Sequence, residues 1–470
     1  MRLFNQSIYS RRREQLSKIL KQGVVLFLGN TESPRNYQDN TYKFRQDSTF
    51  LYFFGLTRPG LVVIYDLDNQ KTTLFGEEIS VDDIIWTGIQ PSLGDLASQT
   101  VIDKISPLAK LPGMVMNLLR KNAQIHYLPP YRMYNKIRLS QLLQIPVDKV
   151  DLNVSPELVN AVVRMRSVKE DCEIQEIERG LGLTRELHLK VIYNARPGIR
   201  VKELVGMVSE LVEAHSYDFA YPVILTVHGE ILHNNSHGDV LKKGQLLLGD
   251  FGAETDMGYA SDITRTIPAD SYFTQQQREI YQVVLEAQQA AVDSLLPGVS
   301  NRDIHFIASL RIAAGLKDIG VMHGDTEEAI ALGAHALFFP HGIGHMIGLD
   351  VHDMEDLGED SVGYGPDMVR NDQFGLKSLR LAKKLQPGFI ISIEPGIYFI
   401  PALIDLWESE KKFNSFINYD VLKKYRSFGG IRIEDDYQIT GNGARLLGKP
   451  IPKTIEELEF LKGASTLEVS

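Results

Sequence analysis

Two aspartates on either side of a short polar stretch are the first residues in this chain whose types and spacing suggest chemistry. Asp250 follows an apolar run, and Asp262 lies within Tyr259–Ile267, so both stand in segments typical of strands. Glu254–Gly258 between them suits a hairpin loop closed by a glycine with positive φ. Pairing about Asp256 would place the two aspartates opposite each other on one face. Buried together they would repel, which indicates a bound cation; two loop-end aspartates without a metal are the alternative.

A second polar group lies in the apolar, glycine-containing stretch Phe338–Asp353, which reads FFPHGIGHMIGLDVHD. It carries His341, His345 and His352, and its glycines allow a close approach of the backbone. Neutral imidazole is a ligand for Zn, Mn, Fe and Co. The alternative is three structural histidines that donate to backbone carbonyls.

Two further carboxylates stand at strand positions. Glu394 ends an apolar strand directly before a Pro-Gly pair, where it is either a cap or a group aimed into a cleft. Glu434 shares one face of the alternating segment Ile431–Ile439 with Arg432 and Asp436, and that face points either to water or to a site.

Taken together, these stretches offer four carboxylates and one imidazole, a set that suits two hard divalent ions such as Mn, Co or Fe(II). Two ions about 3.5–4 Å apart share a hydroxide that can act as the nucleophile in hydrolysis. The residues of this set are Asp250, Asp262, His345, Glu394 and Glu434.

Length and composition bound the remaining possibilities. A chain of 470 residues favours two domains, and 43% apolar with 23% charged residues is typical of a globular protein. The net charge of −10 argues against general binding of nucleic acid or of an anionic membrane. Cys172 is the one cysteine, which fits a reducing compartment, and no stretch approaches the ~20 apolar residues of a membrane span. We expect a cytoplasmic protein.

The first part of the chain alternates between strand and helix patterns, which predicts a smaller α/β domain with a mixed sheet over residues 1–160. Ser10–Lys21 has helical spacing, and its arginines Arg11, Arg12 and Arg13 are expected to be solvated. Four strands are predicted, at Val24–Leu28, Leu61–Tyr65, Lys71–Phe75 and Ile125–Leu128.

From residue 161 the pattern changes to long helices beside antiparallel strands, so an α+β domain is predicted over 161–450, followed by a tail over 451–470. Ser155-Pro156 is a helix start, and Ser167 with Glu170 forms a capping box for a helix over Val168–Ile192.

At the five candidate ligands the sequence resembles the pita-bread metallopeptidases, the group that contains methionine aminopeptidase, prolidase, aminopeptidase P and creatinase. The resemblance implies that Asp250 binds the first metal, that Asp262 and Glu434 bridge, and that His345 and Glu394 bind the second. It also implies that Glu394 accepts the proton of the attacking water. Arg432 is implied to contact the ligand side chains without binding a metal ion itself. His233, His341 and His352 match histidines that position the substrate and stabilise the tetrahedral intermediate.

Within this group the N-terminal half resembles aminopeptidase P, on the segment Tyr42–Ser48 and on Trp86 and Arg166. The resemblance implies an enzyme that releases the residue before proline from peptides, with two metal ions, most typically Mn, although Co, Fe or Zn also fit. Trp86 matches a residue lent to a neighbouring subunit's site and Arg166 one at the domain junction, which implies a homodimer or homotetramer. Prolidase, which cleaves Xaa-Pro dipeptides, shares much of the signature and is the alternative; a peptide-binding protein without catalysis is a third.

Two features depart from the family pattern. The spacing between Asp250 and Asp262 is one residue longer than usual, which we attribute to the hairpin loop. The long segment Ile400–Gly429 separates the last two ligands and is expected near the rim of the cleft.

Overall fold

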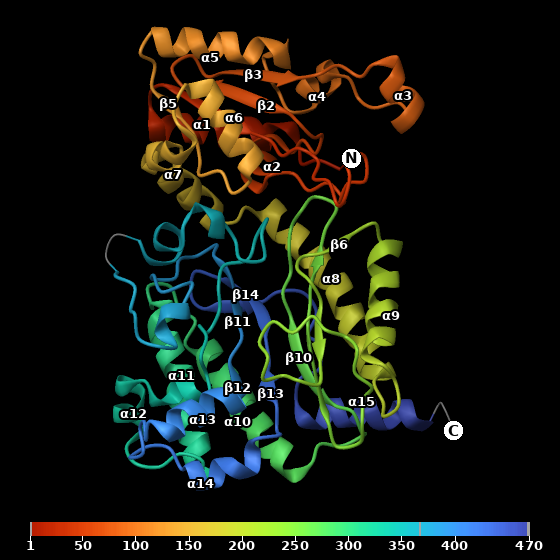
Figure 1. The fold of residues 1–470 in the computed structure, drawn as a ribbon, viewed down its shortest axis with the longest axis vertical. Coiled ribbons are helices and arrows are strands. Elements are labelled where there is room, and N and C mark those ends of the chain that lie inside the picture. The colour runs from red at the N-terminus through yellow and green to blue at the C-terminus, as the bar shows by residue number, and fades with distance from the viewer. Residues whose placement is uncertain (1, 366–367, 468–470) are drawn as a thin grey trace. The chain divides into compact units, whose positions relative to one another are not determined.

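A computed structural model describes residues 2–365 and 368–467 of the chain (Figure 1). These residues form two compact units. The first contains the residues up to Arg166 together with Met354–Ser361, and the second contains Ser167–Asp353 and the residues from Val362 onward. The division at residue 160 between independently folding domains stays a prediction.

The first unit is built on a mixed five-stranded sheet with the strand order β4-β3-β2-β1-β5. β1 is antiparallel to β2 and β2 to β3, whereas β5 and β4 join in parallel at the two edges. The four predicted strands are confirmed as β1, β2, β3 and β5, and β4 was not predicted. The strands are β1 (Val24–Leu28), β2 (Val62–Asp66), β3 (Lys71–Gly76), β4 (Lys104–Pro107) and β5 (Ile125–His126).

Helices cover both faces of this sheet. On one face Val24 and Ile64 pack with Leu111 and Leu139 of two helices, and on the other Phe27 contacts the aromatic rings of a third. The helices are α1 (Gln6–Leu20), α2 (Ser48–Phe54), α3 (Val81–Thr87), α4 (Leu93–Gln99), α5 (Leu111–Arg120), α6 (Met133–Leu143) and α7 (Pro156–Ser167). The predicted α/β layer structure is therefore confirmed.

Two of the three arginines of α1 were wrongly predicted to be solvated, whereas Arg11 is exposed as expected. Arg12 and Arg13 are buried, and they donate to the backbone carbonyls of Tyr52 and Phe53 at 2.8 and 2.9 Å. These carbonyls lie in the last turn of α2, where helix geometry leaves C=O groups without partners. The guanidinium groups thus cap a neighbouring helix, which the spacing along α1 could not reveal.

The second unit carries short antiparallel strands between two groups of helices, with α8 and α9 on one side and α10 and α11 on the other (Figure 1). Its strands pair as β10-β8-β7, β11-β14-β15, β12-β13 and β6-β9. The strands are β6 (Asp218–Phe219), β7 (Ile224–Thr226), β8 (Leu246–Asp250), β9 (Ala253–Glu254), β10 (Thr264–Pro268), β11 (Ile390–Ile393), β12 (Gly396–Tyr398), β13 (Gly430–Arg432), β14 (Asp435–Ile439) and β15 (Ala444–Leu446). The helices are α8 (Asp171–Asn194), α9 (Val201–Ala214), α10 (Gln275–Asp293), α11 (Asn301–Asp318), α12 (Thr326–Leu332), α13 (Pro401–Ser409), α14 (Tyr419–Leu422) and α15 (Ile455–Leu467). The α+β class is confirmed.

The start of α8 differs from the prediction. Ser167 is the last residue of α7, and the N-cap of α8 is Glu170, which forms a capping box with Glu173. Glu170 takes the place of the predicted serine cap because α7 continues through Ser167. Within residues 2–365 and 368–467, no helix combines the length and the apolar character that a bilayer crossing requires.

Candidate metal centre

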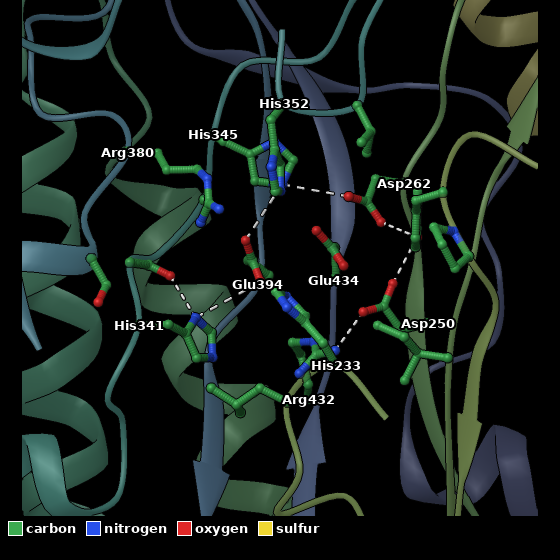
Figure 2. Close-up of a pocket in the computed structure, with 18 of the residues that line it drawn as sticks. His233, Asp250, Asp262, His341, His345, His352, Arg380, Glu394, Arg432 and Glu434 are labelled. Carbon is green, nitrogen blue, oxygen red and sulfur yellow. Dashed lines mark hydrogen bonds and ion pairs between the residues drawn. The ribbon is translucent and has the colours of Figure 1, made fainter. Parts of the chain in front are cut away.

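The five candidate ligands surround one cavity of about 430 Å³ in the second unit (Figure 2). Four of them stand where strands end or begin. Asp250 is the last residue of β8, and Asp262 lies two residues before β10. Glu394 directly follows β11, and Glu434 lies between β13 and β14. Strand ends are suitable positions, since the sheet fixes the backbone while the side chain is free to project into the cavity.

The fifth ligand reaches the cavity because its segment runs along β11. The N–H of Ser392 donates to the carbonyl of His345 at 2.9 Å, and the N–H of Glu394 donates to that of Ile343 at 2.8 Å. A side chain at Gly344 would meet the carbonyl oxygen of Ser392 at 1.9 Å from its Cβ, so the close approach requires glycine. The backbone pairing therefore brings the imidazole of His345 beside the carboxylate of Glu394.

The turn of the β8–β10 hairpin is centred one residue later than predicted. The N–H of Thr255 donates to the carbonyl of Tyr259 at 2.9 Å, and that of Gly258 to the carbonyl of Thr255 at 2.8 Å. The centre of the turn is therefore Met257 and not Asp256. Gly258 has the predicted positive φ, at 84°.

As a result, the prediction that the two aspartates stand directly opposite each other was wrong. Asp250 is paired with Thr264, and Asp262 lies diagonally across from it. A register change of two residues leaves every side chain on its face, because side chains along a strand alternate with period two. Both carboxylates consequently still line the same cavity.

Around His345, acceptor atoms converge without a donor between them. Its Nδ1 lies 3.2 Å from the carbonyl oxygen of Met346, which places the ring proton there. The other nitrogen, Nε2, then has a lone pair that faces Asp262 Oδ2 at 3.4 Å and Glu394 Oε1 at 3.6 Å. Three acceptors in this arrangement favour a cation at their centre.

The bridging candidate Glu434 adds a second reason to expect a cation. Its Oε2 accepts from the hydroxyl of Thr264 at 2.7 Å, whereas Oε1 is buried and has no hydrogen-bond partner among the described residues. Ligand atoms of Asp262, His345 and Glu434 lie within 4.8 Å of one another. The donor set fits divalent metal ions, since a buried acceptor without a hydrogen bond is costly unless an ion binds it.

Burial shifts the pKa of the carboxyls upward when they are considered without an ion. Burial, and then the charge of Asp250, raises the pKa of Asp262 to about 7. Burial likewise raises the pKa of Glu394 to about 7, and that of Glu434 well above its ordinary value. Bound cations reverse such shifts, because they favour the charged form of each carboxylate.

Two side chains hold the aspartates: Tyr221, which was not predicted, and Arg432, which was. The hydroxyl of Tyr221 donates to Asp250 Oδ1 at 2.7 Å and is also hydrogen-bonded to Asp262. Arg432 Nη2 lies 2.5 Å from Asp250 Oδ2, and its Nη1 donates to the hydroxyl of Tyr398 at 2.8 Å. Neither tyrosine has a sequence signal, since their spacing to the ligands is set by the tertiary fold.

All three histidines predicted to act on the substrate line the cavity. His341 is held by the carbonyl of Gly342 and the hydroxyl of Tyr398, each at 2.8 Å, and burial lowers its pKa to about 3. Burial, and then the charge of Arg432, also lowers the pKa of His233. The ring of His352 stands edge-on to that of His345, with centroids 4.4 Å apart. Their roles in catalysis stay predictions.

Other predicted residues lie elsewhere. Arg166 is buried in the first unit and donates to Thr49 at 3.0 Å, and Trp86 is 84% exposed on α3. None of the described residues of Ile400–Gly429 lines the cavity, and the place of this segment near the rim stays a prediction. The segment pairs with the chain after α11, where Ile417 forms a β-bridge with Met322.

Comparisons with known proteins agree with this site. The description "Metallopeptidase family M24" matches residues 175–441, and "Aminopeptidase P, N-terminal domain" matches residues 9–126. The human Xaa-Pro dipeptidase is 30% identical over 93% of this chain and 88% of its own, and a probable Xaa-Pro aminopeptidase of Uncinocarpus reesii is 30% identical over 93% and 89%. An Escherichia coli aminopeptidase P solved in complex with substrate has a TM-score of 0.82 at 27% identity, covering 99% of this chain and 100% of its own. The aminopeptidase PepP of Pseudomonas aeruginosa has a TM-score of 0.83 at 27% identity, with the same coverage. The chain belongs to metallopeptidase family M24.

Proposed function

We propose that the protein is an Xaa-Pro aminopeptidase that removes the first residue from peptides with proline in second position. The observation that carries this proposal is the convergence of four carboxylates and one imidazole on one cavity, with donor atoms that fit two divalent ions. When bound, such ions supply an activated water and stabilise the charge that develops on the attacked carbonyl oxygen. Manganese is the proposed ion, with Co, Fe and Zn also compatible with this donor set. The ligands are Asp250, Asp262, His345, Glu394 and Glu434.

The remaining groups of the cavity are proposed to handle the substrate. Glu394 accepts the proton of the attacking water, for which a carboxylate that lines the cavity is suitably placed. His341 is neutral near pH 7 and lies with Nδ1 3.8 Å from Glu394 Oε2, so it can contact the substrate beside Glu394 without adding a charge. His352 and His233 orient the scissile carbonyl, because both rings line the cavity.

A wall for the proline ring is also available. Pro222, Ile224, Leu232 and Val351 line the cavity together with the histidines. An Xaa-Pro bond has no N–H and a fixed φ, so a protease that depends on hydrogen bonds to the backbone loses one there. An apolar wall that packs on the pyrrolidine ring replaces part of that lost affinity.

One observation favours Xaa-Pro dipeptidase as the second candidate. Arg380 lines the same cavity, and a guanidinium at that place can bind the free carboxylate of a dipeptide. The alignment with the human Xaa-Pro dipeptidase over 93% of the chain agrees with this reading. A protein that binds peptides without cleaving them has less support, because every predicted ligand is present.

The deciding experiment compares hydrolysis of an Xaa-Pro dipeptide with that of an Xaa-Pro-Yaa-Zaa tetrapeptide in the presence of Mn. An aminopeptidase cleaves the tetrapeptide at least as well as the dipeptide, whereas a dipeptidase cleaves only the dipeptide. Arg380→Gln serves as the internal check, because it raises KM for the dipeptide far more than for the tetrapeptide only if Arg380 binds the terminal carboxylate. Absence of hydrolysis of both peptides with two ions bound would refute a peptidase altogether.

We further propose a homodimer or homotetramer in the cytoplasm. No residue of α3 is buried, and the apolar side chains of Ile85 and Trp86 on this helix and of Ile89 just after it are exposed. A second copy that covers α3 would remove this surface from water and place Trp86 near the partner's site. Sedimentation of wild type and Trp86→Ser tests the assembly, which the substitution should weaken. The single cysteine supports the reducing compartment.

A further inference from the structure

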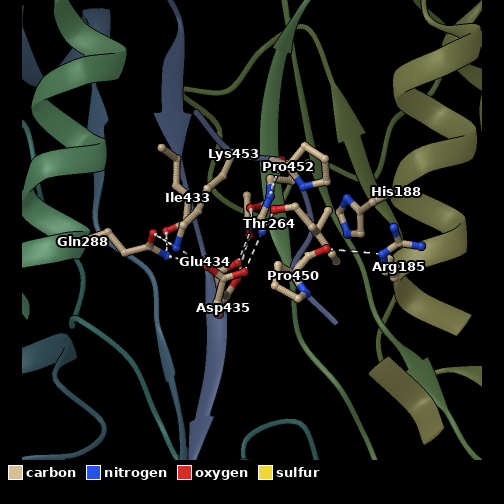
Figure 3. Close-up of polar contacts among 12 residues, drawn as sticks. Arg185, His188, Thr264, Gln288, Ile433, Glu434, Asp435, Pro450, Pro452 and Lys453 are labelled. Carbon is tan, nitrogen blue, oxygen red and sulfur yellow. Dashed lines mark hydrogen bonds and ion pairs between the residues drawn. The ribbon is translucent and has the colours of Figure 1, made fainter. Parts of the chain in front are cut away.

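A buried polar network surrounds Asp435, the residue that directly follows the candidate ligand Glu434 (Figure 3). The network includes Arg265 on β10, which is only 2% exposed. Arg265 Nη1 donates to the carbonyl oxygens of Thr264 at 2.9 Å and of Glu434 at 2.6 Å. The guanidinium thus joins the strand that follows Asp262 to the backbone of Glu434.

Gln288, which reaches the network from α10, extends it to a third ligand segment. Its Nε2 lies 3.3 Å from the carbonyl oxygen of Ile393 and 3.3 Å from that of Ile433. These residues directly precede Glu394 and Glu434 in the chain. One side-chain amide therefore binds the backbone next to two different candidate ligands.

The third component is the segment Pro450–Lys453, which contributes backbone carbonyls and the side chain of Lys453 (Figure 3). Arg265 donates to the carbonyl of Ile451 at 2.9 Å through Nη2 and to that of Pro452 at 3.1 Å through Nε. Arg185 of α8 donates to the carbonyl of Pro450 at 3.3 Å. The segment is thus fixed from both sides.

Asp435 is the carboxylate that the two cations of the network, Arg265 and Lys453, share. Its Oδ1 accepts from Arg265 Nη2 at 2.6 Å, and its Oδ2 accepts from Lys453 Nζ at 2.7 Å. Lys453 Nζ also donates to Gln288 Oε1 at 2.8 Å. Asp435 follows Glu434 directly, so the two carboxylates point to opposite sides of one strand.

We propose that Arg265, Gln288 and Lys453 are positioning residues that set the spacing of the two metal ions through the backbone at Asp262, Glu394 and Glu434. None of the three lines the cavity, so the effect passes through the ligands and not through contact with substrate. Three ligand segments from distant parts of the chain share this one network, so a change in the network alters their relative positions together. Residues that orient metal ligands in this way typically contribute about 10–100-fold to metal affinity. The inference rests on the dinuclear centre of the proposed function.

The test variant is Arg265→Lys, which keeps a positive charge beside Asp435 but loses the fork that reaches the carbonyls of Glu434 and Pro452. The matched control is Arg278→Lys on α10, because Arg278 pairs with Glu459 of α15 and contacts no ligand-bearing segment. Each protein is stripped of metal and titrated with Mn²⁺ by calorimetry, and the spin coupling of the loaded site is recorded by EPR. Thermal unfolding of each protein is measured in parallel.

Wild type should bind two Mn²⁺ with an exchange-coupled spectrum. Arg265→Lys should bind the second ion about 10–100-fold more weakly and lose the coupled signal, with KM for the peptide unchanged. Arg278→Lys should match wild type in both readouts. If Arg265→Lys is unfolded, Gln288→Leu replaces it with the same expected loss.

Suppose that Arg265→Lys or Gln288→Leu is folded and has the coupled spectrum and the Mn²⁺ affinity of wild type. That result would overturn the positioning role and leave the dinuclear centre in place. The positioning role would also be overturned if the control Arg278→Lys weakened Mn²⁺ binding as much as Arg265→Lys does. Failure of wild type itself to bind two Mn²⁺ would instead overturn the dinuclear centre, and the positioning role with it.

Discussion

Removing one negative charge from the site should stabilise the protein without metal and destabilise it with metal. In Asp262→Asn, the remaining oxygen can still accept from the hydroxyl of Tyr221, which is hydrogen-bonded to Asp262 in wild type. The new amide faces His345 Nε2, where wild type holds a carboxylate oxygen at 3.4 Å. In wild type, a carboxylate oxygen of Asp262 faces the lone pair of His345 Nε2. In the variant, the amide N–H of the new asparagine faces this lone pair and can donate to it.

The magnitude follows from the pKa of Asp262, which burial and the charge of Asp250 raise from 3.8 to about 7. A raised folded-state pKa of an acid means that the charged form is disfavoured in the folded protein. The penalty is absent below pH 3.8, grows as the pH rises, and is complete above the folded-state pKa of about 7. Three pKa units correspond to about 4 kcal/mol, of which burial of the polar amide offsets a part, so we expect a gain of about 2–4 kcal/mol at pH 7.5.

The assay is unfolding by urea at pH 7.5, once in EDTA and once in excess Mn. In EDTA the variant should be more stable than wild type, and the difference should shrink as the pH is lowered toward 4. In Mn the order should reverse, since an ion at a thousand times its Kd stabilises wild type by about 4 kcal/mol.

Asp435→Asn is the matched control: it breaks a buried pair with Arg265 and should be less stable than wild type in both conditions. A variant that is less stable than wild type in EDTA would refute the view that this cluster of carboxylates is held together by cations.

Three further predictions concern single side chains. Glu394→Gln should lower kcat by about 10²–10⁴ because the proton acceptor is lost, and activity within a few-fold of wild type would exclude that role. His352→Ala should keep both ions by elemental analysis and lower kcat by about 10²–10³; loss of the ions would show a ligand role instead. His335 is buried with neither ring nitrogen hydrogen-bonded among the described residues, and burial lowers its pKa from 6.5 to about 4. Wild type therefore loses stability as the pH falls from 6.5, by about 2 kcal/mol at pH 5. His335→Phe should not show this loss in thermal melts, and identical pH profiles would contradict the assignment.

Local patterns in the sequence predicted the elements and the polar groups that stand at their ends. Asp250, Glu394 and Glu434 each follow or interrupt an apolar strand, and an unpaired carboxylate at such a place is visible without a structure. His345 was singled out by the glycines around it, because Gly344 permits the close approach to β11. These signals lie within a few residues of each side chain.

What the sequence could not predict depends on which segments meet in three dimensions. Arg12 and Arg13 have the spacing of a solvated face, yet their partners are carbonyls 40 residues further along the chain. Tyr221 and Gln288 carry no pattern at all, since their importance comes from the acceptors that surround them. The hairpin register was missed because one residue at the turn decides it, and Thr255 and Gly258 close that turn through backbone hydrogen bonds.

The order of the ligands along the chain also governs when the centre can come into being. Asp250 and Asp262 share a hairpin, but Glu434 lies more than 170 residues later. During synthesis from the N-terminus, the strands that carry Asp250 and Asp262 are therefore made before Glu434, and the ligand set stays incomplete until the segment of Glu434 leaves the ribosome. Loop closure over such distances is slow, so the hydrolytic centre is completed only after the segment of Glu434 has been made.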